Sequence, residues 1–507
     1  MRSVLHIRLF KAIALSTALL LGLGTTGYWS PLGLFSSPAH AYTPDEQRQT
    51  EARRLLLLGA EQFEQQQFSQ ALQSWEAALG HYQALGDRAG ELSILVNLGV
   101  VHSTLGQYVD AEQRFITALA IAQEQAQEQA QVQEQTQQDY AVIAQILGQL
   151  GTVYNQLGRY EEAIATIRDA IILSADQGEH WIDANTLIQL SQAYQAVGNY
   201  SQALVALHHA QQSAALEQNP LAEISTWLSV GNVAETLGQY GDATVAYQAA
   251  LGKAQAIHHQ QAEGAALGSL GNIYLLLGQS EQALESYTQA LMRQDAVGDR
   301  QGILTTQINL ARIYQNLSNG EQALTLLQSA LHLSDELGDR SSEAQALTLL
   351  GQHYLVQGNP ATATEVFRQA QSLYHEQGDR RGEASVLAHL GQAAEQMGDG
   401  VQAIEWFQQA LPMAQAIHDQ STIGKILSAL GRLEQQRGQL DQAITHYQNA
   451  VAVHEAMGQD LASLPPNQQT AFWDTITVDY QALAALLVER DRPDEAQAIL
   501  ERLNQGF

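Results

Sequence analysis

Histidines and carboxylates are the side chains most able to carry chemistry in this 507-residue chain, which has 16 histidines and 53 acidic residues. The histidines form two adjacent pairs, His208-His209 and His258-His259. Neighbours on a helix point about 100° apart, so neither pair can share a metal ion as residues one turn apart can. His454-Glu455 lacks the second histidine of the His-Glu-x-x-His zinc motif. We therefore expect no metal site.

No other grouping of reactive side chains predicts an enzyme. Paired carboxylates such as Glu161-Glu162 are sequential and face apart on a helix. The glycines follow a helical pattern and do not form the strand-to-helix loop that holds phosphates. The chain has no cysteine, which excludes a cysteine nucleophile, thiolate metal ligands and disulfides. We expect neither catalysis nor a cofactor.

One series of polar residues recurs at a regular spacing, each member directly after a small residue: Val100, Thr152, Gln192, Asn232, Asn272, Arg312, Gln352, Gln392 and Arg432. Amides donate and accept hydrogen bonds and so suit the backbone of an extended peptide, whereas arginines suit a carboxylate. On the same helical face we place Asn309, one turn before Arg312, and His389, one turn before Gln392; Leu276 and Val356 would add apolar contacts. The candidate peptide-binding residues are Asn232, Asn272, Asn309, Arg312, Gln352, Gln392 and Arg432. The alternative is a merely solvated surface, since glutamine is common throughout the chain.

An internal repeat of 40 residues must position this series. An alanine marks it at Ala71, Ala111, Ala163, Ala203, Ala243, Ala283, Ala323, Ala363, Ala403 and Ala443, with 12 extra residues before Ala163. A small residue marks it again at Gly59, Gly99, Gly151, Ser191, Gly231, Gly271, Ala311, Gly351, Gly391 and Gly431. An array this regular indicates stacked repeats that bury a shared core.

Each repeat is predicted to form two helices. In "LGSLGNIYLLLGQ" apolar residues follow one helical stripe from Leu267, and Gly278 ends the helix. In "EQALESYTQAL" Ala283 and Tyr287 lie on the inner side of the second helix. A "GDR" break follows in several repeats, with glycine closing one helix and aspartate capping the next. Since the repeats keep a small residue at Gly271, we predict that it allows close approach of the paired helices.

The pattern Leu267-x-x-Leu270-Gly271-x-x-Tyr274, then Ala283-x-x-x-Tyr287 and Ala290, resembles the tetratricopeptide repeat. The 40-residue unit, in place of the usual 34, resembles the repeats of kinesin light chain and spindle-orientation adaptors. Length alone would also suit armadillo or HEAT repeats, but the small residues favour tetratricopeptide repeats. The resemblance implies an all-α, right-handed superhelical solenoid of about 10 or 11 repeats, covering residues 42–461. It also implies a non-enzymatic scaffold that binds proteins or peptides on its concave face.

Two segments depart from the repeat. Residues 123–138, rich in glutamine, are predicted to form a long exposed helix or a mobile loop, acting as a solvated spacer or a coiled-coil contact. Residues 462–507 are predicted to form a degenerate helix pair with Ala496 in the alanine role. Within it, "LLVERDRPDEAQAILERL" is similar to the segment before the CHAT domain in bacterial tetratricopeptide–CHAT proteins, although no such domain or cysteine follows here. Two alternatives therefore stay open. One is the recognition subunit of a split CHAT-type protease or of another enzyme complex, and the other is a purely structural spacer or self-assembling array.

The first 41 residues resemble a secretory signal. Arg2, Arg8 and Lys11 precede a short apolar stretch, Ala12–Gly24, and small residues flank His40, so cleavage is expected after Ala41. The alternative is an uncleaved anchor in the inner membrane. The net charge of −29 argues against nucleic acid or an anionic membrane as a partner. We expect an exported protein, periplasmic or secreted.

Overall fold

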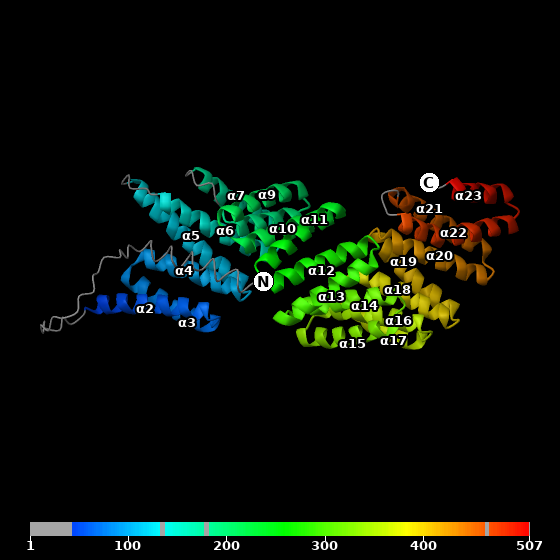
Figure 1. Ribbon diagram of the computed structural model, residues 1–507, viewed down its shortest axis with the longest axis horizontal. Coiled ribbons are helices and arrows are strands. Elements are labelled where there is room, and N and C mark those ends of the chain that lie inside the picture. Colours follow the sequence, from blue (N-terminus) through cyan, green and yellow to red (C-terminus); the bar gives the residue numbers. More distant parts are fainter. Residues whose placement is uncertain (1–42, 132–136, 177–181, 462–465, 506–507) are drawn as a thin grey trace. The chain divides into compact units, whose positions relative to one another are not determined.

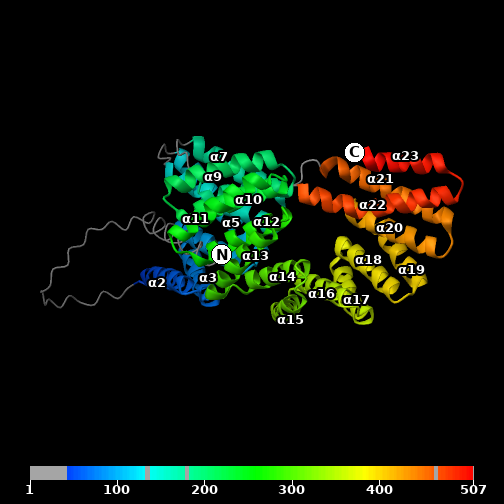
Figure 2. The same ribbon diagram turned by 45° about the vertical axis from the view of Figure 1, so that its right-hand side comes forward.

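The protein is described from a computed structural model that covers residues 43–131, 137–176, 182–461 and 466–505. These residues form 22 helices, and none of them lies in a strand. The chain divides into two compact units, residues 1–258 and 259–507. In each unit the helices pack in consecutive pairs (Figures 1 and 2), so the predicted all-α repeat fold is confirmed. The predicted signal, residues 1–41, lies outside the described residues.

The helices alternate between the first and the second member of a repeat. We call the even-numbered ones A helices and the odd-numbered ones B helices. The first unit contains α2 (Pro44–Glu64), α3 (Phe68–Leu85), α4 (Arg88–Thr104), α5 (Tyr108–Gln131), α6 (Gln137–Gln156), α7 (Tyr160–Asp176), α8 (Ala184–Ala196), α9 (Tyr200–Leu216), α10 (Pro220–Thr236) and α11 (Tyr240–Ala256).

The second unit contains α12 (Gln260–Leu276), α13 (Ser280–Val297), α14 (Arg300–Asn316), α15 (Gly320–Leu337), α16 (Arg340–Val356), α17 (Pro360–Gln377), α18 (Arg380–Gln396), α19 (Gly400–Ala416), α20 (Gln420–Gln436), α21 (Leu440–Leu461), α22 (Pro466–Glu489) and α23 (Pro493–Gln505). Within it each A helix also contacts the next A helix, from α12 through α20. One side of the A helices is therefore shared between repeats.

The small residue of each A helix is a packing position, as predicted. A Cβ atom added to Gly271 would lie 2.9 Å from the ring of Tyr287 in the paired B helix. At Gly351 the added atom would lie 2.4 Å from the ring of Phe367. These aromatic side chains are almost fully buried. Glycine is kept because the aromatic ring occupies the space that a side chain would need. The packing of that ring offsets the cost of glycine in a helix, which is about 1 kcal/mol relative to alanine.

The predicted breaks also form as expected. Gly278 follows α12 with φ +70°, and Gly298 ends α13 with φ +66°, a left-handed conformation that glycine adopts without a steric penalty. Asp299 then caps α14, where its Oδ1 accepts a hydrogen bond from the backbone N–H of Gly302 at 3.0 Å. The glycine and the aspartate of "GDR" thus reverse the chain and begin the next repeat.

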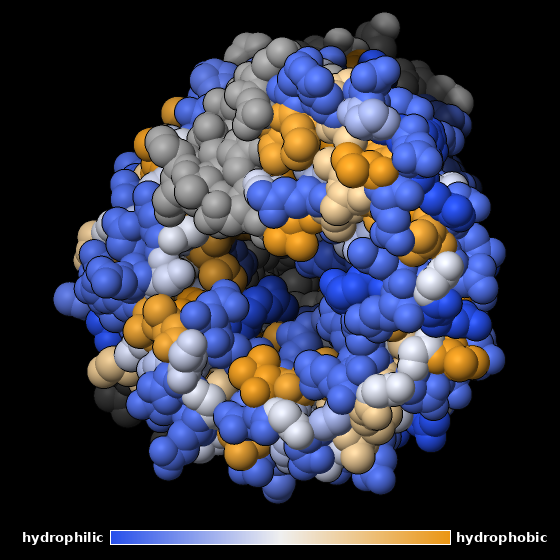
Figure 3. Space-filling view, turned by 90° about the vertical axis from the view of Figure 1, so that its right-hand side faces the viewer, coloured by the Kyte–Doolittle hydropathy of each residue, from blue (hydrophilic) through white to orange (hydrophobic). Residues whose placement is uncertain are grey.

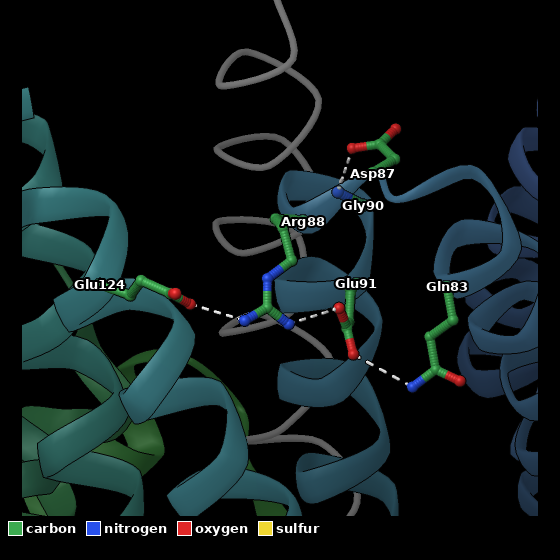
Figure 4. A network of polar contacts seen from close by, with 6 residues as sticks. All are labelled: Gln83, Asp87, Arg88, Gly90, Glu91 and Glu124. Atoms are coloured by element: carbon green, nitrogen blue, oxygen red, sulfur yellow. Dashed lines mark hydrogen bonds and ion pairs between the residues drawn. The ribbon is translucent and has the colours of Figure 1, made fainter. Parts of the chain in front are cut away.

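The arginine of "GDR" links the two helices of its own repeat, a role that the sequence pattern does not reveal. Figure 4 shows Arg88 between two carboxylates: Glu91 of its own helix at 3.0 Å and Glu124 of α5 at 2.6 Å. Glu91 also accepts a hydrogen bond from Gln83 of α3 at 3.0 Å, while Asp87 caps α4. One network therefore ties α3, α4 and α5 together. Arg300 pairs with Glu336 in the same way in the second unit.

The two segments that depart from the repeat are partly helical. α5 continues to Gln131, into the predicted insertion, and Ala126 is only 5% exposed within the core of the first unit. This part is therefore not a fully solvated spacer, because the lengthened α5 packs along α6. Residues 132–136 lie outside the described residues. At the other end α22 and α23 pack as a helix pair, in which Ala496 is buried.

Candidate functional site

The candidate site is the inner face of the second unit, which we define as the side of α12, α14, α16, α18 and α20 where successive A helices contact one another. Its polar residues are Asn272, Asn309, Arg312, Gln352, His389, Gln392, Glu395, Lys425 and Arg432. Six of the seven predicted residues belong to this face. The seventh, Asn232, lies on α10 in the first unit.

Asn272 is engaged inside its own repeat. The hydroxyl of the buried Tyr287 donates a hydrogen bond to Asn272 Oδ1, and Asn309 Nδ2 approaches the same oxygen at 3.4 Å. Asn272 is half-buried, and its carbonyl oxygen is held within its own repeat. A buried hydroxyl needs a hydrogen-bond partner, and the asparagine provides it.

Asn232 repeats this arrangement in the first unit. The Tyr247 hydroxyl lies 2.7 Å from Asn232 Oδ1 and 2.8 Å from a carboxylate oxygen of Glu235, so its one proton is shared by two acceptors. In both repeats the asparagine stands 15 residues before the tyrosine. Where that ring is phenylalanine, at Phe367, the matching residue is Gln352. An asparagine 15 residues before a tyrosine is therefore the sequence signal of this hydrogen bond in both repeats.

Gln352, His389 and Gln392 form a hydrogen-bonded chain from α16 to α18. Gln352 Nε2 lies 2.7 Å from His389 Nε2, and His389 Nδ1 lies 3.0 Å from Gln392 Oε1. The His389 ring also stacks on Phe367, with centroids 5.3 Å apart. Burial lowers the pKa of His389, and Lys425 acts in the same direction, against the hydrogen bond to Gln392. The imidazole is therefore neutral, accepting from Gln352 and donating to Gln392.

The two predicted arginines differ in their surroundings. Arg432 makes two hydrogen bonds to Glu395, at 2.8 and 2.9 Å, and these bonds raise its pKa. Its expected carboxylate partner is thus supplied by α18. Arg312 is exposed, and among the described residues it forms no ion pair. Lys425, which we did not predict, is a second exposed cation of this face, and it too forms no ion pair within the described part of the chain.

The two predicted apolar contacts are accessible to solvent. Leu276 is 49% exposed and Val356 is 87% exposed, at the ends of α12 and α16. Val356 lies one turn after Gln352 on α16, so the wall offers an apolar side chain beside the amides. The inner face can therefore provide amide, cationic and apolar contacts. Among the residues that the structure describes, Arg312 carries the one guanidinium of this face that is not in an ion pair.

Metal sites and enclosed cavities are two other kinds of site that the described ranges could contain. No group of three or more histidine, aspartate or glutamate side chains there could hold a metal ion. A cavity of about 330 Å³ lies between α21, α22 and α23, lined in part by Val451, Leu487 and Ile499, and it contains none of the predicted residues.

Hydrophobic surface is another feature that could mark a binding site. No helix within the described part of the chain is long and apolar enough to cross a membrane. On the face drawn in Figure 3, apolar side chains are scattered among hydrophilic ones.

Comparison with known proteins identifies the repeat. Family models described as tetratricopeptide repeat match residues 51–124, 142–214, 266–297, 302–376, 342–416, 382–456 and 482–502, together more than half of the chain. The comparison with curated proteins gave no match.

Two solved structures, RapI and NprR, share the fold at low sequence identity. The apo form of RapI is 13% identical, with a TM-score of 0.55, over 73% of this chain and 98% of that one. The apo form of the quorum sensor NprR from B. thuringiensis is 14% identical, with a TM-score of 0.50, over 73% of this chain and 99% of that one. BtubC (BKLC) from P. vanneervenii is 20% identical, with a TM-score of 0.39, over 43% of this chain and 91% of that one. The repeat pattern, the paired helices and the family matches agree, and the chain belongs to the tetratricopeptide repeat family.

Proposed function

We propose that this protein is a non-enzymatic scaffold that binds an extended segment of a partner protein, or a peptide, along the inner face of the second unit. The observation that carries the proposal is the uncompensated charge of that face. Arg312 and Lys425 are exposed cations without an ion pair among the described residues, in a chain whose net charge is −29. Such groups favour a partner segment that brings carboxylates.

Arg312 is the proposed anchor. It follows Asn309 by three residues, so both side chains project from the same side of α14. A guanidinium binds a carboxylate through two parallel hydrogen bonds, which gives orientation as well as energy. Arg432 is not an anchor in this proposal, because Glu395 already holds its guanidinium. That ion pair links α20 to α18.

The amides act mainly as a preformed wall. Gln352 and Gln392 are held by His389, and Asn272 is held by Tyr287. Groups that are already ordered lose little conformational entropy when a ligand binds, which favours recognition without rearrangement. Asn272, Asn309, Gln352 and Gln392 remain predicted contacts on this face, with Arg312 as the residue on which the test depends. Asn232, on α10 of the first unit, stays a separate prediction.

The test uses peptides selected from a random phage-displayed library on the purified chain. Their dissociation constants are then measured by fluorescence anisotropy for wild type, Arg312→Ala and Arg368→Ala. Arg368 is an exposed arginine of the B helix α17, so it is a control for loss of one charge. We expect selected peptides to carry acidic residues and Arg312→Ala to weaken binding about tenfold, the value of one charge-assisted contact. Equal affinities for the two variants would refute the proposed site.

We also propose that the protein is exported and cleaved after Ala41. The support is the basic start, the apolar stretch Ala12–Gly24 and the small residues around His40. The cut would leave Thr43 in place, whose side chain and Glu46 cap the first described helix reciprocally. The mass of the protein recovered from bacterial envelope extract tests this. A mature chain beginning at Tyr42 is expected, and a full-length membrane-bound chain would favour the anchor.

A second candidate is the recognition subunit of a split protease. What supports it is the similarity of residues 486–503 to the segment that precedes CHAT domains. Co-purification with a separate cysteine protease subunit, lost when residues 462–507 are deleted, would establish it. Purification of the full chain without such a subunit would leave the peptide scaffold as the function.

A further inference from the structure

The A helices that follow a junction between repeats share one kind of N-terminal cap. The side chain of the residue before the helix accepts a hydrogen bond from the backbone N–H three residues later, at 2.9 to 3.2 Å. The capping residue is aspartate or asparagine at Asp87, Asp183, Asn219, Asp299, Asp339, Asp379 and Asp419. In each of these caps the acceptor is a carboxylate or carboxamide oxygen.

α12 is the exception, because its cap is His259. The Nδ1 atom of His259 accepts a hydrogen bond from the Ala262 N–H at 3.2 Å. An amide nitrogen only donates, so Nδ1 must carry a lone pair and the ring proton must lie on Nε2. A histidine can therefore cap this helix only while it is neutral.

Among the described residues, the charged groups of the second unit close to the start of α12 in sequence or packing have partners of their own. Glu263, one turn into α12, is paired with Arg293 of α13 at 2.7 Å. α14 also packs on α12, and Arg300 in its first turn is paired with Glu336. His258 is the exposed neighbour along the chain, and within the described residues His259 itself forms no ion pair.

We propose that His259 is an acid-sensitive cap at the point where the chain passes from the first compact unit, which ends at His258, into the second. Imidazole gains a proton between pH 8 and pH 5. Protonation removes the acceptor for the Ala262 amide and places a positive charge at the N-terminus of α12, where the helix dipole is also positive. The first turn of α12 then opens in acid, while the junctions capped by aspartate stay closed.

Hydrogen exchange of the full-length chain tests the cap directly. Exchange is followed at pH 7.5 and pH 5 by mass spectrometry with single-amide resolution, and each rate is divided by the intrinsic rate at the same pH. We expect protection of the Ala262 amide to fall about fivefold in acid, the value of one lost N-cap. The amides of Gly302 and Ser342, capped by Asp299 and Asp339, are internal controls in the same sample.

Two variants separate the cap from other effects of acid. His259→Asp installs the cap of the other junctions and is expected to keep protection at Ala262 at both pH values. His259→Ala removes the acceptor and is expected to give low protection at both. The proposal is overturned if the acid loss at Ala262 in wild type matches that at Gly302, or if His259→Asp shows the same acid loss as wild type.

Discussion

The replacement of Gly351 by alanine is the sharpest test of how the repeats pack. Gly351 lies in the middle of α16, and the position of its missing Cβ atom is 2.4 Å from Cε1 of Phe367 in α17. Carbon atoms in contact normally lie about 3.5–4.0 Å apart. Phe367 is fully buried, so its ring cannot move aside without disturbing the core.

Two opposing contributions decide whether Gly351→Ala stabilises or destabilises the α16–α17 pair. Alanine is better than glycine in a helix by about 1 kcal/mol. Overpacking a filled core costs about 1–3 kcal/mol, and a 2.4 Å approach to a buried ring places this site near the upper value. We therefore expect Gly351→Ala to destabilise the α16–α17 pair by about 2 kcal/mol.

The chain offers a matched control in Gly268 of α12, where an added Cβ atom would meet nothing within 4 Å. Gly268→Ala should stabilise its helix by about 1 kcal/mol, because only the propensity term remains. Gly271→Ala, with a nearest approach of 2.9 Å, should fall between the two. The repeat at Ala311 indicates a rescue, since there the paired B helix carries the smaller Leu327. Gly351→Ala combined with Phe367→Leu should recover most of the lost stability.

Hydrogen exchange is the appropriate assay, because a long repeat array does not unfold in one two-state step. A loss of about 2 kcal/mol corresponds to roughly thirtyfold faster opening of the amides in α16 and α17. Gly268→Ala should slow exchange in α12 about fivefold. The explanation of the conserved small residue is refuted if Gly351→Ala protects its helix as Gly268→Ala does.

Three further predictions concern single contacts. Asn272→Ala should destabilise its repeat by about 1–3 kcal/mol because the hydrogen bond between the Tyr287 hydroxyl and Asn272 Oδ1 is lost. Tyr287→Phe in the same chain should reduce that loss, and a double-mutant cycle followed by hydrogen exchange measures both. The pKa of His389 is lowered by burial. The contribution of the neutral His389 ring to the free energy of unfolding is therefore present above the unfolded-state pKa, and it is lost as the pH falls through the lowered folded-state pKa. Thermal unfolding between pH 7.5 and pH 5 should consequently show a smaller acid loss for His389→Gln than for wild type. His418→Gly should stabilise the end of α19 by about 1 kcal/mol, since His418 has φ +54°. His332→Gly, at an exposed position of α15, should destabilise by a similar amount, and both are read from hydrogen exchange of the helix concerned.

The periodicity of the sequence was sufficient for the architecture. Side chains that recur at helical spacing must lie on one face, and a single helix pair cannot bury that face alone. The positions of Ala283 and Gly271 in the 40-residue unit therefore determined both the helix pairs and the stacking of repeats. Glycine at Gly298 and aspartate at Asp299 likewise marked a junction through local backbone chemistry, which depends little on distant contacts.

The availability of polar groups was decided only by the tertiary structure. Arg312 and Arg432 occupy the same position of the repeat, yet one is unpaired among the described residues and the other is held by Glu395, 37 residues away. Asn272 reads as a surface amide until Tyr287 is placed against it. Helical periodicity specifies the direction of a side chain, but the partner that it meets comes from another helix. The sequence therefore determined the wall, and the packing of the repeats determined which of its groups remain for a ligand.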